Sequence, residues 1–165
     1  MTTQFYTTLK SPLGPLVLTS SGKAITGLYT PAHSWQAKKK GIRNPRLFKR
    51  AVQQLNEYFK GKRRQFDLPL APEGTPFQKR VWKALQTIRC GETKSYGQIA
   101  KSVKNSKASR AVGAANRENP ICIIVPCHRV IGADGKLTGY AGGLKAKQWL
   151  LRHELSGFVL QRRKD

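Results

Sequence analysis

The chain has 165 residues, with 31 Lys or Arg against 8 Asp or Glu and a formal net charge of +23 at pH 7. This charge exceeds what solubility requires and attracts polyanions, so DNA, RNA or an anionic membrane surface are candidate partners. A basic surface adapted to the protein's medium is the alternative. No apolar run reaches eighteen residues, and the N-terminus lacks a basic flank followed by an apolar core, so we expect no membrane span and no secretory signal.

The cysteines and histidines give no metal-binding pattern, because their spacing matches neither Cys-x-x-Cys nor a zinc motif. An odd number of cysteines favours free thiols in a reducing cytosol over a disulfide framework. We therefore expect a cytoplasmic protein without metal or cofactor. The residues concerned are Cys90, Cys122, Cys127, His33, His128 and His153.

Residues 1–72 are predicted to form a small strand-rich lobe with one helix, a structural support without a catalytic constellation. Strands are expected at residues 6–9, 16–19, 24–29 and, from an alternating pattern, 66–70. Residues 31–43 are polar and basic and are expected to form an exposed loop. A helix is expected to begin with Asn44 as its cap and Pro45 in its first turn, and to end at Gly61.

Residues 73–157 are predicted to form a mainly helical second domain, followed by a basic tail at 158–165, so the fold class is α+β. A helix should start at Thr75-Pro76. Ser95-Tyr96-Gly97-Gln98 has the pattern of a capping box and predicts a short helix. Asn105-Ser106 offers a cap for a second helix over 107–116, which together with the first is typical of a helix-turn-helix.

Residues 93–117 contain six basic residues and no acid, the bias that phosphate contacts require. The second helix is rich in small residues, so it could lie close to a DNA backbone or enter the narrow minor groove, with Arg110 reaching into the base stack. An ordinary helical hairpin in a basic protein remains the alternative.

The most informative stretch is Ile121-Cys122-Ile123-Ile124-Val125-Pro126-Cys127-His128-Arg129-Val130. Its apolar run predicts a short buried strand that Pro126 ends, with Cys127 at the strand's exit. An adjacent imidazole, His128, could take the thiol proton and make the sulfur a nucleophile. The alternative is a buried structural cysteine beside a solvent-facing histidine. A glycine-rich loop at 138–143 and a last helix at 144–155 follow, with a frayed polar tail.

The Pro126-Cys127-His128-Arg129-Val130 run lies between a helix-turn-helix and Gly139-Tyr140-x-Gly142-Gly143, followed by a helix with Glu154. In this order the elements resemble the O6-alkylguanine–DNA alkyltransferases, densely over residues 75–155 and loosely over the N-terminal lobe. The resemblance implies a methylated-DNA–protein-cysteine methyltransferase that repairs DNA by direct reversal. Such a protein flips the damaged guanine from the duplex and transfers its alkyl group irreversibly to Cys127 in a single turnover.

The same resemblance implies the roles of individual residues. Cys127 is the alkyl acceptor, His128 removes its proton through a bridging water, and Glu154 orients the imidazole. Asn119 pins the turn around them, and Tyr96 lies beside the rotated nucleotide's phosphate and the N3 of its ring. The implied DNA contacts, in which Arg110 fills the vacated place in the stack, are Lys94, Ser95, Tyr96, Lys107, Arg110, Ala111, Gly113 and Arg117. The implied substrate pocket consists of Val130, Tyr140, Ala141, Gly142, Gly143 and Lys147.

Double-stranded DNA carrying O6-alkylguanine is the implied partner, O4-alkylthymine is a second candidate lesion, and the protein is expected to be a monomer. The chain departs from some relatives at Ala141, where others carry a serine, and at Asn116, where others carry a larger apolar residue. It also lacks the N-terminal zinc ligands of some members. Two other functions remain open: a helix-turn-helix module with a structural cysteine, and a cysteine hydrolase built on Cys127, His128 and Glu154.

Overall fold

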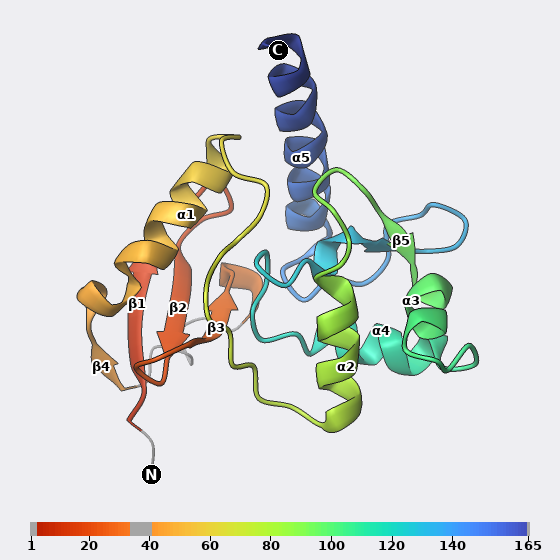
Figure 1. The fold of residues 1–165 in the computed structure, drawn as a ribbon, viewed down its shortest axis with the longest axis horizontal. Helices are drawn as coiled ribbons and strands as arrows, with labels where there is room; N and C mark the ends of the chain where they lie inside the picture. The colour runs from red at the N-terminus through yellow and green to blue at the C-terminus, as the bar shows by residue number, and fades with distance from the viewer. Residues whose placement is uncertain (1–2, 34–40, 165) are drawn as a thin grey trace.

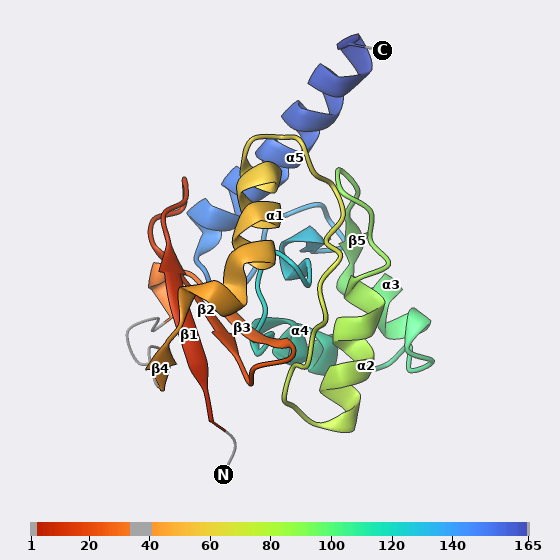
Figure 2. The same ribbon diagram turned by 60° about the vertical axis from the view of Figure 1, so that its left-hand side comes forward.

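The computed structural model describes residues 3–33 and 41–164, with the backbone alone for 157–164. Two lobes lie side by side, one built from a sheet and helix α1, the other from helices α2, α3 and α4 (Figure 1). Helix α5 begins between them, and its C-terminal half extends beyond both lobes (Figures 1 and 2). The predicted α+β class, with a strand-rich N-terminal lobe, is confirmed.

The N-terminal sheet has the strand order β3-β2-β1-β4. Neighbours β1–β2 and β2–β3 are antiparallel, whereas β4 joins β1 in parallel. All five residues of β2 are buried, so this central strand has both faces covered. The first three strands match the predicted ones closely; the four are β1 (Phe5–Leu9), β2 (Leu16–Ser20), β3 (Ile25–Tyr29) and β4 (Ile42–Arg43).

Helix α1 (Lys49–Phe59) packs its apolar face against the core, because Ala51, Leu55 and Tyr58 recur at helical spacing and are buried. A 3-10 turn, Pro45–Phe48, precedes it. The predicted start at Asn44 and Pro45 is therefore correct in place, but the Asn44 side chain makes no capping hydrogen bond. The chain leaves the helix at Gly61, whose φ of 74° favours glycine.

In the C-terminal lobe, α3 begins with the capping box that the sequence predicts, Ser95 with Gln98. Helix α2 starts at the predicted Thr75-Pro76, and there the structure adds a second capping box, Thr75 with Gln78. Helix α4 packs on both α2 and α3, and the Trp82 indole donates to the Ala115 carbonyl at 2.8 Å. The elements are α2 (Pro76–Leu85), β5 (Lys94–Ser95), α3 (Tyr96–Ser102), α4 (Ser109–Arg117), a 3-10 turn (Cys127–Arg129), β6 (Val130–Ile131) and α5 (Leu144–Lys164).

The strand predicted at residues 121–125 is wrong, because this apolar run folds into a buried turn. The Val125 amide donates to the Ile121 carbonyl, which closes the turn, and Ile123 has a φ of 73°, rare for a β-branched residue. Only Ile121 makes a β-bridge, to Leu28 of β3. Burial alone produced the strand-like pattern, and periodicity cannot distinguish a buried strand from a buried turn.

Other predicted boundaries also differ from the structure. Residues 66–70 form no strand and contribute only a bridge from Leu70 to Ile25, while the predicted loop at 31–43 contains a 3-10 turn (Pro31–His33) and β4. Residues 34–40 of that loop lie outside the described chain. The N-cap of α4 is Ala108 rather than Asn105 or Ser106. Helix α5 continues through Lys164, so the backbone is helical where the sequence predicts a frayed tail.

The N-terminal lobe supports the second lobe through its edge strand. The Leu28 amide of β3 donates to the Pro120 carbonyl at 2.8 Å, and the Cys122 amide donates back to the Leu28 carbonyl at 3.1 Å. These bonds fix the turn that precedes Cys127 against the sheet. Among the described residues, no helix is long and apolar enough to cross a membrane.

Candidate active site

Cys127 begins a single buried 3-10 turn, Cys127–Arg129. Its side chain is almost completely buried, at 1% exposure. The Asn119 side chain spans the preceding turn, accepting from the Ile121 amide at 3.0 Å and donating to the Val125 carbonyl at 2.9 Å. Asn116 of α4 donates to the Cys127 carbonyl at 3.2 Å, so two buried amide side chains fix the backbone that carries the thiol.

His128 and Glu154 meet in the interior, although 26 residues separate them in the sequence. The His128 Nε2 lies 2.6 Å from Glu154 Oε1, and both side chains are buried. Arg129 donates to both oxygens of the same carboxylate, at 3.0 Å and 2.9 Å. Tyr58 of α1 donates a further hydrogen bond to Oε1 at 2.8 Å, so the N-terminal lobe also orients the carboxylate.

The charges of this network follow from its burial. Burial lowers the pKa of the His128 imidazole below its ordinary value, and Glu154 offsets only part of this effect, so the ring is neutral near pH 7. Burial alone would raise the pKa of Glu154, but His128 and Arg129 hold it well below its ordinary value. A charged carboxylate beside Nε2 favours the tautomer that carries its proton there. Nδ1, which is buried and has no hydrogen-bond partner among the described residues, then keeps a free lone pair.

The pKa of the Cys127 thiol lies below its ordinary value. A hydrogen bond from the Cys122 thiol lowers this pKa most, burial opposes the effect, and Asn119 and the positive charge of Lys147 lower it further. A lowered pKa increases the thiolate fraction near neutral pH, and the thiolate is the nucleophilic form. The site can therefore supply a sulfur nucleophile in a water-poor environment.

The glycine-rich loop after β6 is held close to Cys127 by Lys147 of α5. The buried Lys147 ammonium donates to the Val130 carbonyl at 2.5 Å and to the Thr138 carbonyl at 2.8 Å. Tyr96, at the start of α3, exchanges hydrogen bonds with Thr138 at 3.3 Å and 3.2 Å. A Cβ on Gly142 would come within 2.7 Å of the Tyr140 ring, so this position excludes any side chain.

Helix α4 presents an exposed face rich in small residues beside this loop. Arg110, Ala111 and Ala114 are exposed on it, whereas Val112, Ala115 and Asn116 face the core. None of the six basic residues of segment 93–117 forms a salt bridge with another described residue. The face therefore carries uncompensated positive charge. The members of this basic segment are Lys94, Lys101, Lys104, Lys107, Arg110 and Arg117.

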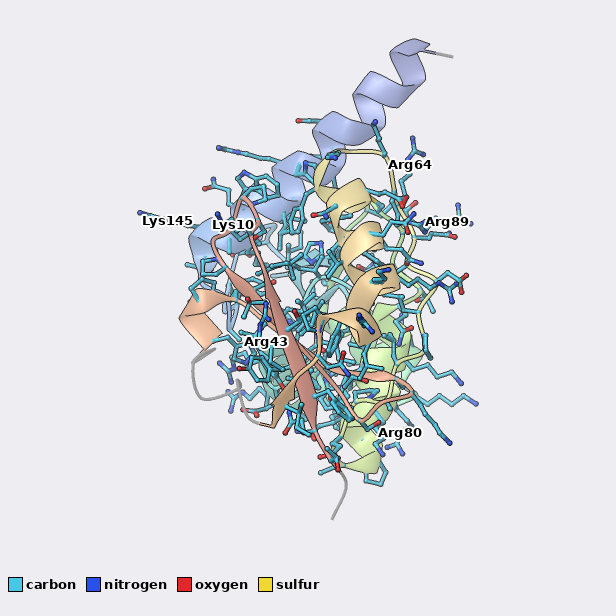
Figure 3. All side chains as sticks on the ribbon, turned by 90° about the vertical axis from the view of Figure 1, so that its left-hand side faces the viewer. Lys10, Arg43, Arg64, Arg80, Arg89 and Lys145 are labelled. Atoms are coloured by element: carbon cyan, nitrogen blue, oxygen red, sulfur yellow. The ribbon has the colours of Figure 1, made fainter. Side chains whose placement is uncertain are left out.

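Basic side chains also extend from elements other than α3 and α4. Figure 3 shows Arg64, Arg89 and Lys145 extending away from the ribbon on other elements, and all three are exposed. The positive charge is thus distributed over several faces of the protein.

The structure brings together Cys127, His128, Glu154, Asn119 and Lys147, and it places Tyr96 at the edge of the same loop. Lys94 and Ser95 pair with β6, beside the loop. Sequence reasoning missed Tyr58, Arg129 and Cys122 as parts of the site. Arg129 stands inside the Pro-Cys-His-Arg-Val run, which could have drawn attention to it, whereas Tyr58 is indistinguishable in sequence from a core residue. Among the described residues, no cluster of His, Cys, Asp or Glu could hold a metal ion.

Comparisons with known proteins match both lobes of the chain to the same family. Residues 4–72 match the family model described as "6-O-methylguanine DNA methyltransferase, ribonuclease-like domain", and residues 76–156 match the model of the DNA binding domain of the same family. A methylated-DNA–protein-cysteine methyltransferase of Methanosarcina mazei is 52% identical over 152 residues, covering 91% of this chain and 96% of the relative. The constitutive enzyme of Bacillus subtilis is 46% identical over 157 residues, covering 91% and 94%.

The fold agrees equally well with solved structures. The crystal structure of Mycobacterium tuberculosis OGT in complex with DNA has a TM-score of 0.88 and 51% identity, with 93% of this chain and 94% of that chain covered. Fold and site together define a DNA repair enzyme that transfers an alkyl group to one of its own cysteines. The chain belongs to the 6-O-methylguanine DNA methyltransferase family.

Proposed function

We propose that this protein repairs O6-alkylguanine in double-stranded DNA by transferring the alkyl group to Cys127 in one irreversible turnover. The observation that carries this assignment is the buried chain of contacts in which Glu154 holds His128 beside Cys127. O4-alkylthymine is a second candidate lesion. We also propose that the protein works as a monomer in the cytoplasm.

The proton of the Cys127 thiol leaves through His128. With Nε2–H donated to Glu154, the free Nδ1 lone pair accepts this proton by way of a water molecule. Glu154 then stabilises the resulting imidazolium, the logic of nucleophile, base and orienting carboxylate. Because Cys127 and His128 are adjacent in the chain, proton transfer through a water molecule is favoured over direct transfer.

The Cys127 thiolate attacks the carbon attached to O6 of guanine. A sulfur–carbon bond forms and the carbon–oxygen bond breaks, with its electron pair passing to the guanine. Tyr96, next to the ring nitrogen N3 in this proposal, donates a proton that balances this charge. The thiolate is a poorer leaving group than the repaired guanine, so the alkyl group stays on Cys127 and the protein is consumed.

The damaged base must leave the duplex to reach a thiol that is 1% exposed. Helix α4 enters the minor groove with its small-residue face, and Arg110 fills the place of the rotated guanine. The remaining contacts go to phosphates, since repair of any guanine requires little sequence preference. We assign these contacts to Lys94, Ser95, Tyr96, Lys107, Ala111, Gly113 and Arg117.

The extruded base is proposed to bind between the Cys127 turn and the glycine-rich loop. One wall of this pocket is formed by Tyr140, Ala141, Gly142 and Gly143. The start of the loop is held by the hydrogen bond from Lys147 to Val130. The close approach at Gly142 supports this assignment, because any side chain there would displace the Tyr140 ring.

Stoichiometry tests the proposal. Protein is incubated with an excess of duplex DNA containing one O6-methylguanine, and repaired duplex is counted against active protein. One lesion repaired per molecule supports a consumed acceptor. Repeated turnover would instead support the cysteine hydrolase, and DNA binding without any repair would support a simple binding module.

A further inference from the structure

The N-terminal lobe is strongly basic, and the DNA contacts proposed for α3 and α4 use none of its charge. Residues 1–72 contain thirteen Lys or Arg against two Asp or Glu. Both acids pair with arginines of the same lobe, Asp67 with Arg50 and Glu57 with Arg63. The remaining positive charge attracts polyanions to this lobe as well.

A groove of about 650 Å³ lies between helix α1 and strands β1 and β4. Thr7 and Thr8 of β1 and Arg43 of β4 line it on the sheet side, and α1 lines the other side. Its one acidic lining residue, Glu57, is already paired. Four cationic side chains line the groove, and each is exposed and forms no salt bridge with another described residue. These groove cations are Arg43, Lys49, Lys60 and Lys62.

The length of the groove suits the backbone of duplex DNA. Lys49 begins α1 and Lys60 directly follows its last residue, so the two positions are about 16 Å apart along the helix axis. Duplex DNA carries one charge per about 1.7 Å of its axis, so a surface of this length faces several phosphates. Gln53 and Asn56, between these lysines on α1, add exposed amides, which are common donors to phosphate oxygens.

The groove is separated from the DNA-binding surface proposed above. Helix α1 and the α3–α4 pair lie at opposite ends of the molecule (Figure 1). The view onto the α1 side shows Arg43 on this end (Figure 3). A short duplex docked on α4 therefore leaves the groove free.

We propose that this groove is a second DNA-binding surface, which holds the phosphate backbone of a duplex other than the one bound by α4. The groove cations contact phosphates, so this surface binds without sequence preference. The inference rests on the proposed function for the first surface alone, where α4 binds the duplex to be repaired. Two such surfaces let the protein hold one DNA segment while α4 samples another.

The number of duplexes bound by each protein molecule tests this inference. Protein is mixed at low salt with an excess of undamaged duplex of about one helical turn, which resists bending around the molecule. Sedimentation velocity then measures the composition of the complexes. The groove variant combines Arg43→Ala, Lys49→Ala, Lys60→Ala and Lys62→Ala. Its matched control removes four exposed basic side chains from other elements, Lys23→Ala, Lys79→Ala, Lys83→Ala and Arg89→Ala.

We expect wild type and the control to bind two duplexes, and the groove variant to bind the second duplex weaker by about tenfold or more. Undiminished binding of the second duplex by the groove variant, or an equal loss in both variants, contradicts the inference, as does a wild type that binds only one duplex. Complexes of two proteins with two duplexes assign the pairing to protein–protein contacts and also contradict it.

Single-turnover transfer from a short damaged duplex is measured in the same proteins. Its rate should be equal in wild type and the groove variant, since the groove cations lie outside the proposed active site and its DNA contacts. Absence of transfer in wild type would reject the proposed function, while the number of bound duplexes would still decide the role of the groove.

Discussion

His128 Nε2 and Glu154 Oε1 lie 2.6 Å apart in the interior, joined by a bond between the 3-10 turn that carries the thiol and the last helix. Arg129 and Tyr58 bind the same carboxylate. Glu154 therefore connects three elements that are distant in sequence: α1, the 3-10 turn and α5. Glu154 orients His128, the proposed general base, and also compensates the buried Arg129 guanidinium. Its removal should therefore affect catalysis and stability together.

Glu154→Gln should slow alkyl transfer and lower the free energy of unfolding by about 3 kcal/mol. The amide still accepts from His128 but leaves the Arg129 charge buried without a counterion, and breaking a buried pair typically costs about that much. Urea denaturation and single-turnover transfer measure the two effects. The matched control is Asp67→Asn, which breaks the exposed 2.5 Å pair with Arg50 and should cost less than about 1 kcal/mol.

The stability difference between wild type and Glu154→Gln should depend on pH. Because the folded-state pKa of Glu154 is lowered from 4.5, its contribution is complete above that value and is lost as the pH falls through the folded-state pKa. We expect the difference to shrink in acid below about pH 4.5. A constant difference from pH 7 to pH 3 would contradict the charged state assigned to this carboxylate.

Lys147 should give a pH dependence of the same sign as Glu154, but in an alkaline range. Burial lowers its pKa from 10.5 to about 8, so between these values the unfolded chain binds a proton that the folded protein does not. Stability then rises with pH across this window. We expect wild type to gain stability relative to Lys147→Met between pH 8 and 10.5, as measured by urea denaturation. A difference that stays flat would mean that Lys147 keeps its proton in the fold.

Arg110→Ala should reduce repair in duplex DNA much more than transfer from a free modified base. The exposed Arg110 on α4 is proposed to act only when a base has left the stack. Rates with duplex substrate and with free O6-benzylguanine are compared for each protein. Arg89→Ala removes an exposed arginine outside the helix pair and should leave the ratio of the two rates unchanged. Equal losses on both substrates would argue against a role in flipping.

Binding to undamaged duplex should weaken steeply with salt. Each phosphate contact contributes about −0.9 to the slope of log K against log salt, so several contacts predict a slope of about −3 or steeper. Lys107→Ala should make the slope shallower by about one. Titrations followed by fluorescence anisotropy measure it, and a flat response would contradict the electrostatic account.

Local signals predicted much of this fold. The helix start at Thr75, the capping box at Ser95 and the apolar faces of the helices are properties of neighbouring residues, and each appears where expected. The buried turn at 121–125 was misinterpreted because its stability comes from distant partners, the Leu28 backbone and the Asn119 side chain. The same reason explains why Tyr58 went unnoticed: its partner, Glu154, is 96 residues away.

The candidate site was predictable only in part. Cys127 and His128 are adjacent in sequence, so the pair could be found by inspection, and Glu154 followed from the resemblance. No spacing rule connects Arg129 to Glu154, because folding alone creates that contact. The small exposed face of α4 was visible in the sequence, since its small residues all belong to one short helix.

The most direct test of the account is the mass of the peptide that carries Cys127 after reaction with duplex DNA containing O6-methylguanine. We predict one added methyl group, located by fragmentation at Cys127 and at neither Cys122 nor Cys90. Cys127→Ser should bind the same DNA and remain unmodified. A methyl group on another residue, or DNA restored to guanine while Cys127 stays unmodified, would contradict the central claim.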